Sequence, residues 1–401
     1  MAHIDRETRK RLAAYLYAVE HLTEDEIKVR LGGISQSTVA KILREAKEEG
    51  VYEQSAVYRG KALSGEDMEL LHALQFQSDL HAKIAARLAA LAPESGPAVY
   101  LYDLRAQGGG GAPIEARVRA FAAEAAPELR RLLGRPKVRN IGVSWGFMIA
   151  AMVEAMGRPS VAPRNRDPVT VIAMCGLPLD DRSTLDSSSA IAENLSEALN
   201  GTRKQARTLG ITPAYLPALS HVEGAEWVWR YIGSAWPYVE VFGTDRLPPG
   251  TRARVAPPAE PLADRMDAFL TSVSIEGGTL GYGSNKLYPA DVIDPAELEK
   301  AVYGDMGGIP LPLPNLDVKQ RDMLQRLGES WTGVTDGHLK RCKAKAATGG
   351  HPASRVPGCI LVAVGAGKAR NVYQAVVEEQ LVNHLFIDYA CAEALDRLLD
   401  G

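Results

Sequence analysis

The chain has 401 residues, of which 46% are hydrophobic and 24% are charged, and its formal net charge at pH 7 is −3. This composition is typical of a soluble globular protein with a large apolar core, and the length favours two or three domains. The near-neutral balance excludes a globally basic nucleic-acid-binding protein, so any contact with DNA has to be local.

The first predicted element is an amphipathic helix from Ile4 to Glu20. Its apolar side chains recur at helical spacing, which places them on one face. We expect this face to pack against the two helices that follow. The residues of the face are Leu12, Tyr15, Leu16 and Val19.

Two short helices joined by a tight turn are predicted by the next stretch, TEDEIKVRLGGISQSTVAKILREAK, which begins at Thr23. Thr23 can cap the first helix, and Glu26 three residues later completes a capping box. Gly32 and Gly33 then end that helix, since glycine readily adopts the left-handed conformation of a helix terminus. Ser35 can cap the second helix through its hydroxyl.

A short helix, a glycine turn and a second helix with a small polar N-terminus form the pattern of a helix-turn-helix that reads DNA. On the second helix the apolar residues share one face, so the polar side chains are left to contact another molecule. The alternative is a helical hairpin packed into a larger core. We predict burial of Val39, Ile42, Leu43 and Ala46, and DNA contacts from Gln36, Ser37, Thr38, Lys41, Arg44 and Lys47.

Residues 1–50 hold nine basic and nine acidic side chains, so the predicted DNA-binding domain is neutral. Non-specific affinity for DNA comes mostly from neutralised phosphates, which makes one such domain a weak binder. A homodimer or homotetramer would multiply that affinity. We therefore expect the protein to bind double-stranded DNA as a homo-oligomer.

The segment after the second of these helices is less regular. Residues 51–57 predict either a short extended wing or a linker. Residues 64–96 predict a long helix with a narrow apolar seam. The seam fits two alternatives, a helix packed on the following domain and a dimerising linker helix. Its residues are Leu80, Ile84, Leu88 and Leu91.

From about residue 97 onwards, strands alternate with helices. This order predicts an α/β domain with a Rossmann-like parallel sheet covered by helices on both faces. A loop with four glycines at 107–111 interrupts the pattern. Strands are predicted at 99–101, 138–143, 169–174, 215–219, 269–275, 359–364 and 382–387, and helices at 117–133, 147–156, 188–199, 369–379 and 389–399.

Four predicted strands end in glycine-bearing turns, at 142–146, 175–178, 276–279 and 365–368. Parallel sheets bind ligands at the carboxyl ends of their strands, where glycines let backbone amides approach an anion. An ordinary strand-to-helix turn also favours glycine, so a single turn is weak evidence. Because Lys368 adds a full charge beside the last turn, the set favours a small anionic or polyhydroxylated ligand.

The four cysteines form no CxxC pair and no metal-ligand spacing. We predict buried free thiols in a reducing cytoplasm, and neither a metal nor a cofactor. The sequence also has no run of about 18 apolar residues, so no membrane segment is predicted. The cysteines are Cys175, Cys342, Cys359 and Cys391.

Six stretches, taken in order, match the motifs of one family: YLYAVEHLTEDEIKVRLGGISQSTVAKILREAKEEGV, IGVSWGFMIAAMVEAM, VTVIAMCGLP, VSIEGG, AVYGDMGGIPL and VAVGAGKARNVYQAVVEEQLVNHLFIDYACAEALDRLL. The first resembles the helix-turn-helix of the SorC family of bacterial transcriptional regulators. The others resemble the glycine-bearing segments and the C-terminal signature of that family, and together they span nearly the whole chain.

The resemblance implies a cytoplasmic DNA-binding regulator of a carbohydrate catabolic operon, controlled by a sugar or sugar phosphate. Its effector domain would be similar in fold to ribose-phosphate isomerases and glucosamine-phosphate deaminases, but without catalysis. The implied domains are a helix-turn-helix at 1–58, a linker or dimerisation helix at 59–96 and a sugar-binding effector domain at 97–401. The implied effector-binding residues are Ser144, Trp145, Gly146, Gly176, Glu276, Gly277, Asp305 and Lys368.

Three departures from the family pattern leave details open. The turn LGGIS is one residue longer than usual, which affects the register of the second DNA helix. Phe147 stands where small hydroxyl residues are common in the family. This leaves two alternatives for the ligand, a sugar phosphate and an unphosphorylated sugar or sugar derivative. An aromatic-rich region fits a ligand lid, a subunit contact or ordinary core packing. Its residues are Trp227, Trp229, Tyr231, Trp236 and Tyr238.

The alternative function is a sugar-phosphate isomerase or deaminase with an accessory DNA-binding module. Such an enzyme needs a positioned acid or base. The available groups are Glu276, Asp305, His384 and Asp388. The helix-turn-helix favours the regulator, because a pure enzyme has no use for one.

Overall fold

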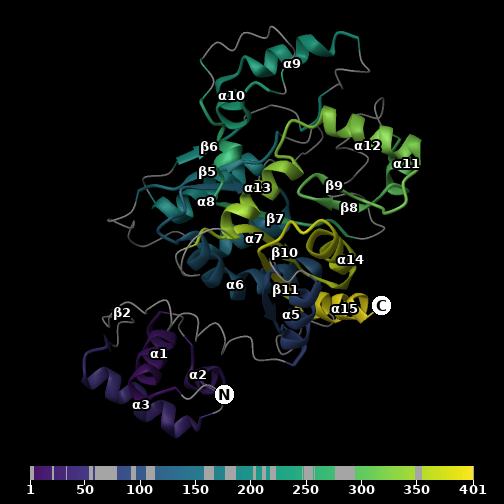
Figure 1. Cartoon of the computed structure of the whole chain (residues 1–401). Helices are drawn as coiled ribbons and strands as arrows, with labels where there is room; N and C mark the ends of the chain where they lie inside the picture. The colour runs from purple at the N-terminus through teal and green to yellow at the C-terminus, as the bar shows by residue number, and fades with distance from the viewer. Residues whose placement is uncertain are drawn as a thin grey trace. The chain divides into compact units, whose positions relative to one another are not determined.

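The computed structural model divides the chain into two compact units, Met1–Ala82 and Lys83–Gly401 (Figure 1). The predicted glycine loop at 107–111 and most of the predicted helix at 64–96 lie outside the described residues. The structure describes residues 4–19, 22–32, 34–53, 57–58, 79–91, 96–104, 113–157, 167–176, 187–201, 205–209, 214–216, 223–245, 247, 256, 258–275, 294–347 and 355–400.

Three capped helices form the first unit. The carboxylate of Asp5 caps α1 by accepting hydrogen bonds from two backbone N–H groups of the first turn. At α2 the predicted capping box is present, because Thr23 accepts from the Glu26 N–H and Glu26 accepts from the Thr23 N–H at 2.7 Å. Ser35 caps α3 by accepting from the Thr38 N–H at 3.2 Å. The helices are α1 (Arg6–Ala18), α2 (Glu24–Arg30) and α3 (Gln36–Glu48).

The apolar faces of these helices meet in one cluster. Leu12 and Leu16 of α1 are fully buried, as predicted. Val19 was expected on the same face but is 43% exposed, because α1 ends one residue earlier and Val19 is its C-cap. The four residues of α3 predicted to be buried all lie in the cluster: Val39, Ile42, Leu43 and Ala46.

The turn and the wing complete this unit. Gly32 follows α2 with a φ of 85°, a left-handed conformation that glycine adopts without strain. Gly33 lies outside the described residues. Beyond α3, strand β1 (Tyr52–Glu53) pairs antiparallel with β2 (Val57–Tyr58), so the predicted extended segment forms a two-stranded wing.

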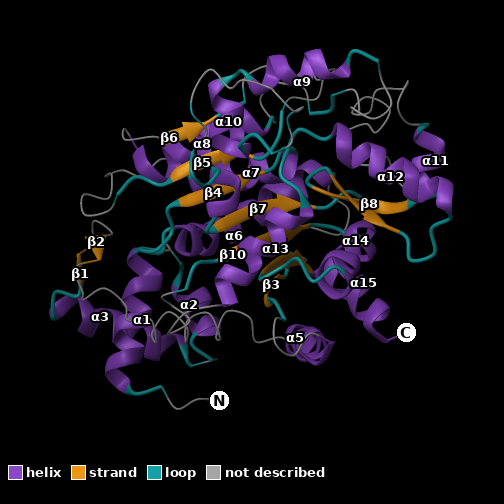
Figure 2. Cartoon of the chain, turned by 45° about the horizontal axis from the view of Figure 1, so that its top comes forward, coloured by secondary structure: helices purple, strands orange, loops and turns teal. Residues whose placement is uncertain are grey.

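A seven-stranded sheet is the frame of the larger unit, and every neighbouring pair in it is parallel (Figures 1 and 2). The strand order is β3-β11-β10-β7-β4-β5-β6. All residues of β10 are buried, which means that both faces are covered there. The predicted α/β class is confirmed. The strands are β3 (Ala98–Tyr102), β4 (Asn140–Val143), β5 (Thr170–Ala173), β6 (Gln205–Arg207), β7 (Ala268–Ser272), β10 (Gly358–Ala363) and β11 (His384–Asp388).

Helices pack around this sheet. Both α7 and α13 contact β10, α7 packs against α6 and α8, and α14 packs against α15. The predicted helix at 369–379 is only partly α-helical, because α14 passes into a π-helical turn at Gln374–Glu378. The helices are α6 (Ile114–Leu133), α7 (Phe147–Met156), α8 (Ser188–Asn200), α13 (Asp336–Ala347), α14 (Ala369–Tyr373) and α15 (Tyr389–Asp400).

An antiparallel hairpin that the sequence pattern did not predict joins the sheet beyond the end of β7. The N–H of Ser274 donates to the carbonyl oxygen of Asp305 at 3.0 Å, and the N–H of Gly307 donates to that of Ser272 at 3.1 Å. Strands β8 (Val302–Met306) and β9 (Ile309–Pro312) form the hairpin.

Other elements were missed as well. Of the extended segment expected at 215–219, residues 217–219 lie outside the described residues, and Tyr215 forms a bridge with Trp331. Strand β6 and five α-helices were not predicted: α9 (Ala225–Gly233), α10 (Trp236–Phe242), α11 (Pro295–Glu299), α12 (Val318–Ser330) and α13 (Asp336–Ala347).

Helix α5 (Asp79–Leu91) is the described part of the predicted seam helix. Ile84 and Leu88 are buried, and ion pairs join the helix to α15. Lys83 and Arg87 both pair with Asp396 of α15. This contact favours the alternative of a helix packed on the following domain, while the dimerisation role stays a prediction.

Thr23→Ala should remove the capping box and lower the free energy of unfolding by about 1 kcal/mol. Urea denaturation followed by circular dichroism measures this change. Val29→Ala is the matched control on the same helix, because Val29 is 74% exposed and its truncation should leave the midpoint nearly unchanged. Equal losses in the two variants would contradict the role of the cap.

Candidate functional site

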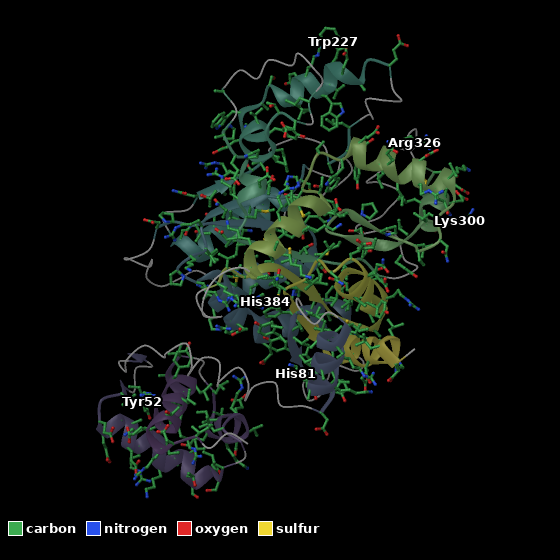
Figure 3. All side chains as sticks on the ribbon, viewed as in Figure 1. Tyr52, His81, Trp227, Lys300, Arg326 and His384 are labelled. Atoms are coloured by element: carbon green, nitrogen blue, oxygen red, sulfur yellow. The ribbon has the colours of Figure 1, made fainter. Side chains whose placement is uncertain are left out.

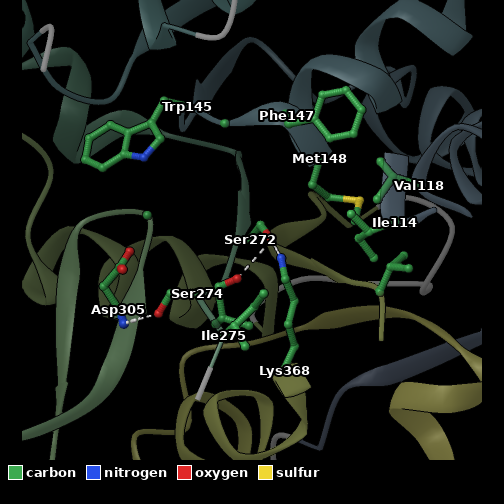
Figure 4. Close-up of a pocket in the computed structure, with 14 residues that line it drawn as sticks. Ile114, Val118, Trp145, Phe147, Met148, Ser272, Ser274, Ile275, Asp305 and Lys368 are labelled. Atoms are coloured by element: carbon green, nitrogen blue, oxygen red, sulfur yellow. Dashed lines mark hydrogen bonds between the residues drawn. The ribbon is translucent and has the colours of Figure 1, made fainter. Parts of the chain in front are cut away.

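A cavity of about 360 Å³ lies at the carboxyl ends of β4, β7 and β10, beside the β8–β9 hairpin (Figure 4). This is the sheet edge at which the glycine turns predicted a ligand. Its wall is largely apolar, with few polar side chains. The polar side chains are Ser272, Ser274, Asp305 and Lys368, and the apolar ones include Ile114, Val118, Phe147, Met148, Val273 and Ile275.

Lys368 reaches into the cavity from the turn after β10 (Figure 4). Its ammonium group donates to the hydroxyl of Ser272 at 2.8 Å. Burial lowers the pKa of Lys368 from 10.5 to about 8, although the negative charges of Asp305 and Asp388 act in the opposite direction. The residue as a whole keeps some exposure, so its amine can meet a ligand.

Asp305 stands on β8 and is only 4% exposed. Its Oδ1 accepts from the Gly308 N–H at 2.8 Å, and its own N–H donates to the Ser274 hydroxyl at 2.8 Å. Its Oδ2 is buried without a hydrogen-bond partner among the described residues. Burial raises the pKa of this carboxyl group. A buried acceptor left without a donor costs free energy, so a ligand hydroxyl or amine would relieve that cost.

A partly buried ion pair holds the Lys368 turn in place. Asp388, at the end of β11, accepts from the Gly365 N–H at 2.8 Å through Oδ1 and from Arg117 at 2.8 Å through Oδ2. Gly365 has a φ of 94°, which favours glycine. Asp388 was predicted only as a possible acid or base, and the role of Arg117 was missed, since no sequence signal pairs α6 with β11.

The N-terminus of α7 faces the same cavity. Gly146, with a φ of 108°, is its N-cap, and no side chain caps the helix. Uncapped N–H groups and the positive end of the helix dipole attract ligand oxygen atoms. Phe147 and Met148 follow, so the donors lie beside an apolar wall.

Trp145 packs against the turn of the hairpin. Its ring is T-shaped on that of Trp331, with centroids 5.7 Å apart. The backbone of Gly308 runs beside both rings, and a Cβ there would lie 2.6 Å from Trp145 and 2.4 Å from Trp331. Trp145 therefore couples the end of β4 to the position of the hairpin.

The predicted effector residues fall into three groups. Trp145, Gly146, Asp305 and Lys368 line the cavity, whereas Ser144 and Gly176 are buried and do not line it within the described residues. The Ser144 hydroxyl turns to the Trp145 carbonyl oxygen at 3.4 Å. Glu276 and Gly277 lie outside the described residues. The hydroxyls of Ser272 and Ser274 were missed, because serine near a strand end is too common to stand out.

The polar face of α3 is open. Of the six predicted DNA contacts Thr38 is partly buried, and Gln36, Ser37, Lys41, Arg44 and Lys47 are exposed. Ser37 and Thr38 also hydrogen-bond the capping hydroxyl of Ser35, at 2.9 and 2.7 Å.

Two acids near the end of α3 pair with basic residues of α1. Glu45 pairs with Arg6 at 2.8 Å, and Glu49, the C-cap of α3, pairs with Lys10 at 2.6 Å. These pairs neutralise two carboxylates near the end of α3. Glu48, on the same face as Lys41 and Arg44, stays exposed, so the pairs remove only part of the negative charge near that face.

The aromatic-rich region divides in two. Trp229 and Tyr238 are buried, whereas Trp227 and Tyr231 of α9 are 67% and 75% exposed. Figure 3 labels Trp227 on helix α9. Trp236 of α10 is 46% exposed. Core packing thus accounts for only part of this region.

No protein-family model and no curated protein sequence matches the chain. Solved structures do match it. The full-length sorbitol operon regulator SorC from Klebsiella pneumoniae gives a TM-score of 0.54 at 15% identity, over 98% of this chain and 100% of that one. The chain shares the fold of that regulator. The overall fold implied by the resemblance to the SorC family is therefore confirmed.

Two further matches cover about four-fifths of the chain. A transcriptional regulator from Streptococcus pneumoniae TIGR4 gives a TM-score of 0.53 at 13% identity, over 80% of this chain and 98% of that one. A putative sugar-binding domain of a transcriptional repressor from Vibrio fischeri gives 0.50 at 14%, over 80% and 100%.

The cysteine prediction is confirmed, since Cys175, Cys342, Cys359 and Cys391 are all buried free thiols. Among the described residues no cluster of three His, Cys, Asp or Glu side chains could hold a metal ion. None of the described helices is long and apolar enough to cross a membrane.

Lys368→Met should stabilise the fold at pH 7 by about 1–3 kcal/mol, because it removes a buried charge. In the wild type the native state loses this proton near pH 8, whereas the unfolded chain holds it to about pH 10.5. The unfolded state thus binds more protons between these values, and wild-type stability rises with pH across that window. The variant should lack this rise.

Urea denaturation from pH 7 to pH 10 tests this prediction. Lys319→Met, at a lysine whose side chain is 77% exposed, should keep the wild-type pH profile. If the Lys368→Met protein is destabilised and its stability still rises with pH, the buried charge of Lys368 is not the cause of that rise.

Proposed function

We propose that the chain is a DNA-binding transcriptional regulator of a carbohydrate catabolic operon, controlled by a sugar or sugar derivative in the sheet-edge cavity. The observation that carries the proposal is the combination of two sites on one chain. One is a winged helix-turn-helix with an exposed polar face on α3. The other is a ligand-sized cavity at the carboxyl edge of a parallel sheet. The structural likeness to the sorbitol operon regulator supports the same reading.

The chemistry of the cavity suits a polyhydroxylated ligand. Asp305 needs a donor, while Lys368 and the uncapped N-terminus of α7 supply donors. Sugar hydroxyls both donate and accept, so one molecule can satisfy all three. Phe147 and Met148 would contact the C–H faces of the ring. We place the effector here, with Glu276 and Gly277 as further predicted contacts.

The regulator would act in the cytoplasm as a homodimer or homotetramer on palindromic operator DNA. One neutral unit binds phosphates weakly, and linked copies raise the effective affinity. The predicted domain division at 1–58, 59–96 and 97–401 belongs to this proposal. Sugar binding would change operator affinity through the placement of the subunits, a coupling between two distinct sites.

Arg44→Ala should weaken binding to the DNA upstream of the protein's own operon by roughly tenfold, because Arg44 is exposed on α3 where base edges and phosphates are reached. Fluorescence anisotropy at moderate salt measures the affinity. Lys137→Ala, which removes an exposed charge from the other unit, should bind like the wild type. No specific binding by the wild type would refute the proposal.

A thermal-shift screen of sugars and sugar phosphates should find a ligand that raises the melting temperature at pH 7. A ligand that pairs with the charged amine should bind about tenfold more weakly at pH 9, because Lys368 has lost most of its charge there. Asp305→Asn should also reduce the shift, since the asparagine amide has only one acceptor oxygen where the carboxylate has two.

Lys319→Met serves as the control and should reproduce the wild-type shift at each pH value, including its decrease at pH 9. Turnover of a hit by the purified protein would instead support the alternative, a sugar-phosphate isomerase or deaminase. A shift that persists unchanged in both Lys368→Met and Asp305→Asn would place the ligand elsewhere.

A further inference from the structure

A second cavity, of about 270 Å³, lies between the hairpin strand β9 and helix α12. It adjoins the sheet-edge cavity across the turn of the hairpin, because Gly307 lines the first cavity and Gly308 the second. Figures 1 and 2 show α12 beside this hairpin. Most of the wall is aromatic and aliphatic, with Tyr215, Pro310, Leu324, Leu327, Trp331 and Leu381 among its residues.

The polar groups on this wall are already paired, with one exception. The indole N–H of Trp331 donates to the Val334 carbonyl oxygen at 2.7 Å. The Tyr215 hydroxyl donates to the Gly308 carbonyl oxygen at 3.3 Å. Asp336 is neutralised by Lys340 at 3.0 Å. These groups need nothing from a ligand, so they define its apolar surroundings.

Glu379 is the exception. It lines the cavity and is only partly exposed, and its carboxylate has no ion-pair partner among the described residues. No lysine, arginine or histidine is among the described residues of the wall. As far as its described wall shows, the cavity therefore combines an apolar interior with one negative charge that no ion pair compensates.

An irregular backbone presents this carboxylate. Glu379 follows the π-helical turn at Gln374–Glu378, and Gln380 after it has a φ of 48°. Such a φ is costly for a residue with a side chain, and π-helical turns are frequent at functional sites. The unusual conformation places Glu379 and Leu381 on the same cavity wall.

We propose that this cavity binds a small apolar molecule that carries a cationic group, with its ammonium at Glu379 and its apolar body between Trp331 and the leucines. The volume corresponds to about nine water-sized volumes of roughly 30 Å³. A primary amine on a single aromatic ring has suitable size and charge. This site is separate from the sugar cavity and does not depend on the regulator function.

The test is a calorimetric titration of the full chain with phenethylamine, compared with 3-phenylpropanoate, its counterpart of opposite charge. The amine should bind at millimolar concentration and the carboxylate should not. Glu379→Gln should weaken amine binding about fivefold, the loss expected for one partly exposed ion pair. Glu378→Gln is the matched control, because Glu378 is exposed and does not line the cavity.

A filling variant tests the location without endangering the fold. Gly328 of α12 lines the cavity, and a Cβ built on it meets nothing within 4 Å. Gly328→Leu should therefore abolish amine binding while keeping or raising the melting temperature, since leucine is the better helix former. Gly328→Ala should keep most of the binding. Absence of amine binding by the wild type, or amine binding unaffected by both Glu379→Gln and Gly328→Leu, would overturn the assignment.

Discussion

The hydrogen bonds between the β8–β9 hairpin and the end of β7 are the constraint on which the ligand cavity depends. Ser274 and Asp305 bond reciprocally, through the Ser274 N–H to the Asp305 carbonyl oxygen and the Asp305 N–H to the Ser274 hydroxyl. Asn371 of α14 donates to the Ser274 carbonyl oxygen at 2.9 Å and fixes the same segment from another side. A Cβ on Gly304 would lie 2.3 Å from both Asn371 and Ser274, so glycine is required for this close approach.

The cavity holds the side chains of Lys368 and Asp305 in buried surroundings, which disfavour the charged form of each. Lys368 loses hydration on burial, and Asp305 has one carboxylate oxygen without a donor among the described residues. Both features lower the stability of the empty protein, and both are relieved by a ligand that supplies acceptors and donors. The ion pair between Asp388 and Arg117, which holds the Lys368 turn, is the compensating rigid element. Binding sites commonly depart from optimal stability in this way.

In the helix-turn-helix unit, ion pairs between helices determine which charged side chains remain exposed. Its composition is neutral, yet Arg6 and Lys10 of α1 pair with Glu45 and Glu49 near the end of α3. Lys10 is 5% exposed, so its charge is committed within the unit. The exposed Lys41 and Arg44 share their face with Glu48, which is exposed as well, so the pairing removes only part of the negative charge near the end of α3. Counting charges along a sequence cannot reveal which acids are paired, because the pairing depends on which helix faces pack together.

The sequence by itself determined the elements that short-range chemistry specifies. The capping box at Thr23, the left-handed Gly32 and the buried face of α3 follow from spacing along one helix, and alternating strands and helices specify a parallel sheet. The same alternation predicted where the strands end, and therefore that Lys368 lies at the carboxyl edge of the sheet. Only the tertiary structure decided the partners of Asp305 and the clamp between Arg117 and Asp388. These depend on contacts between residues far apart in the chain, for which neither periodicity nor propensity carries information.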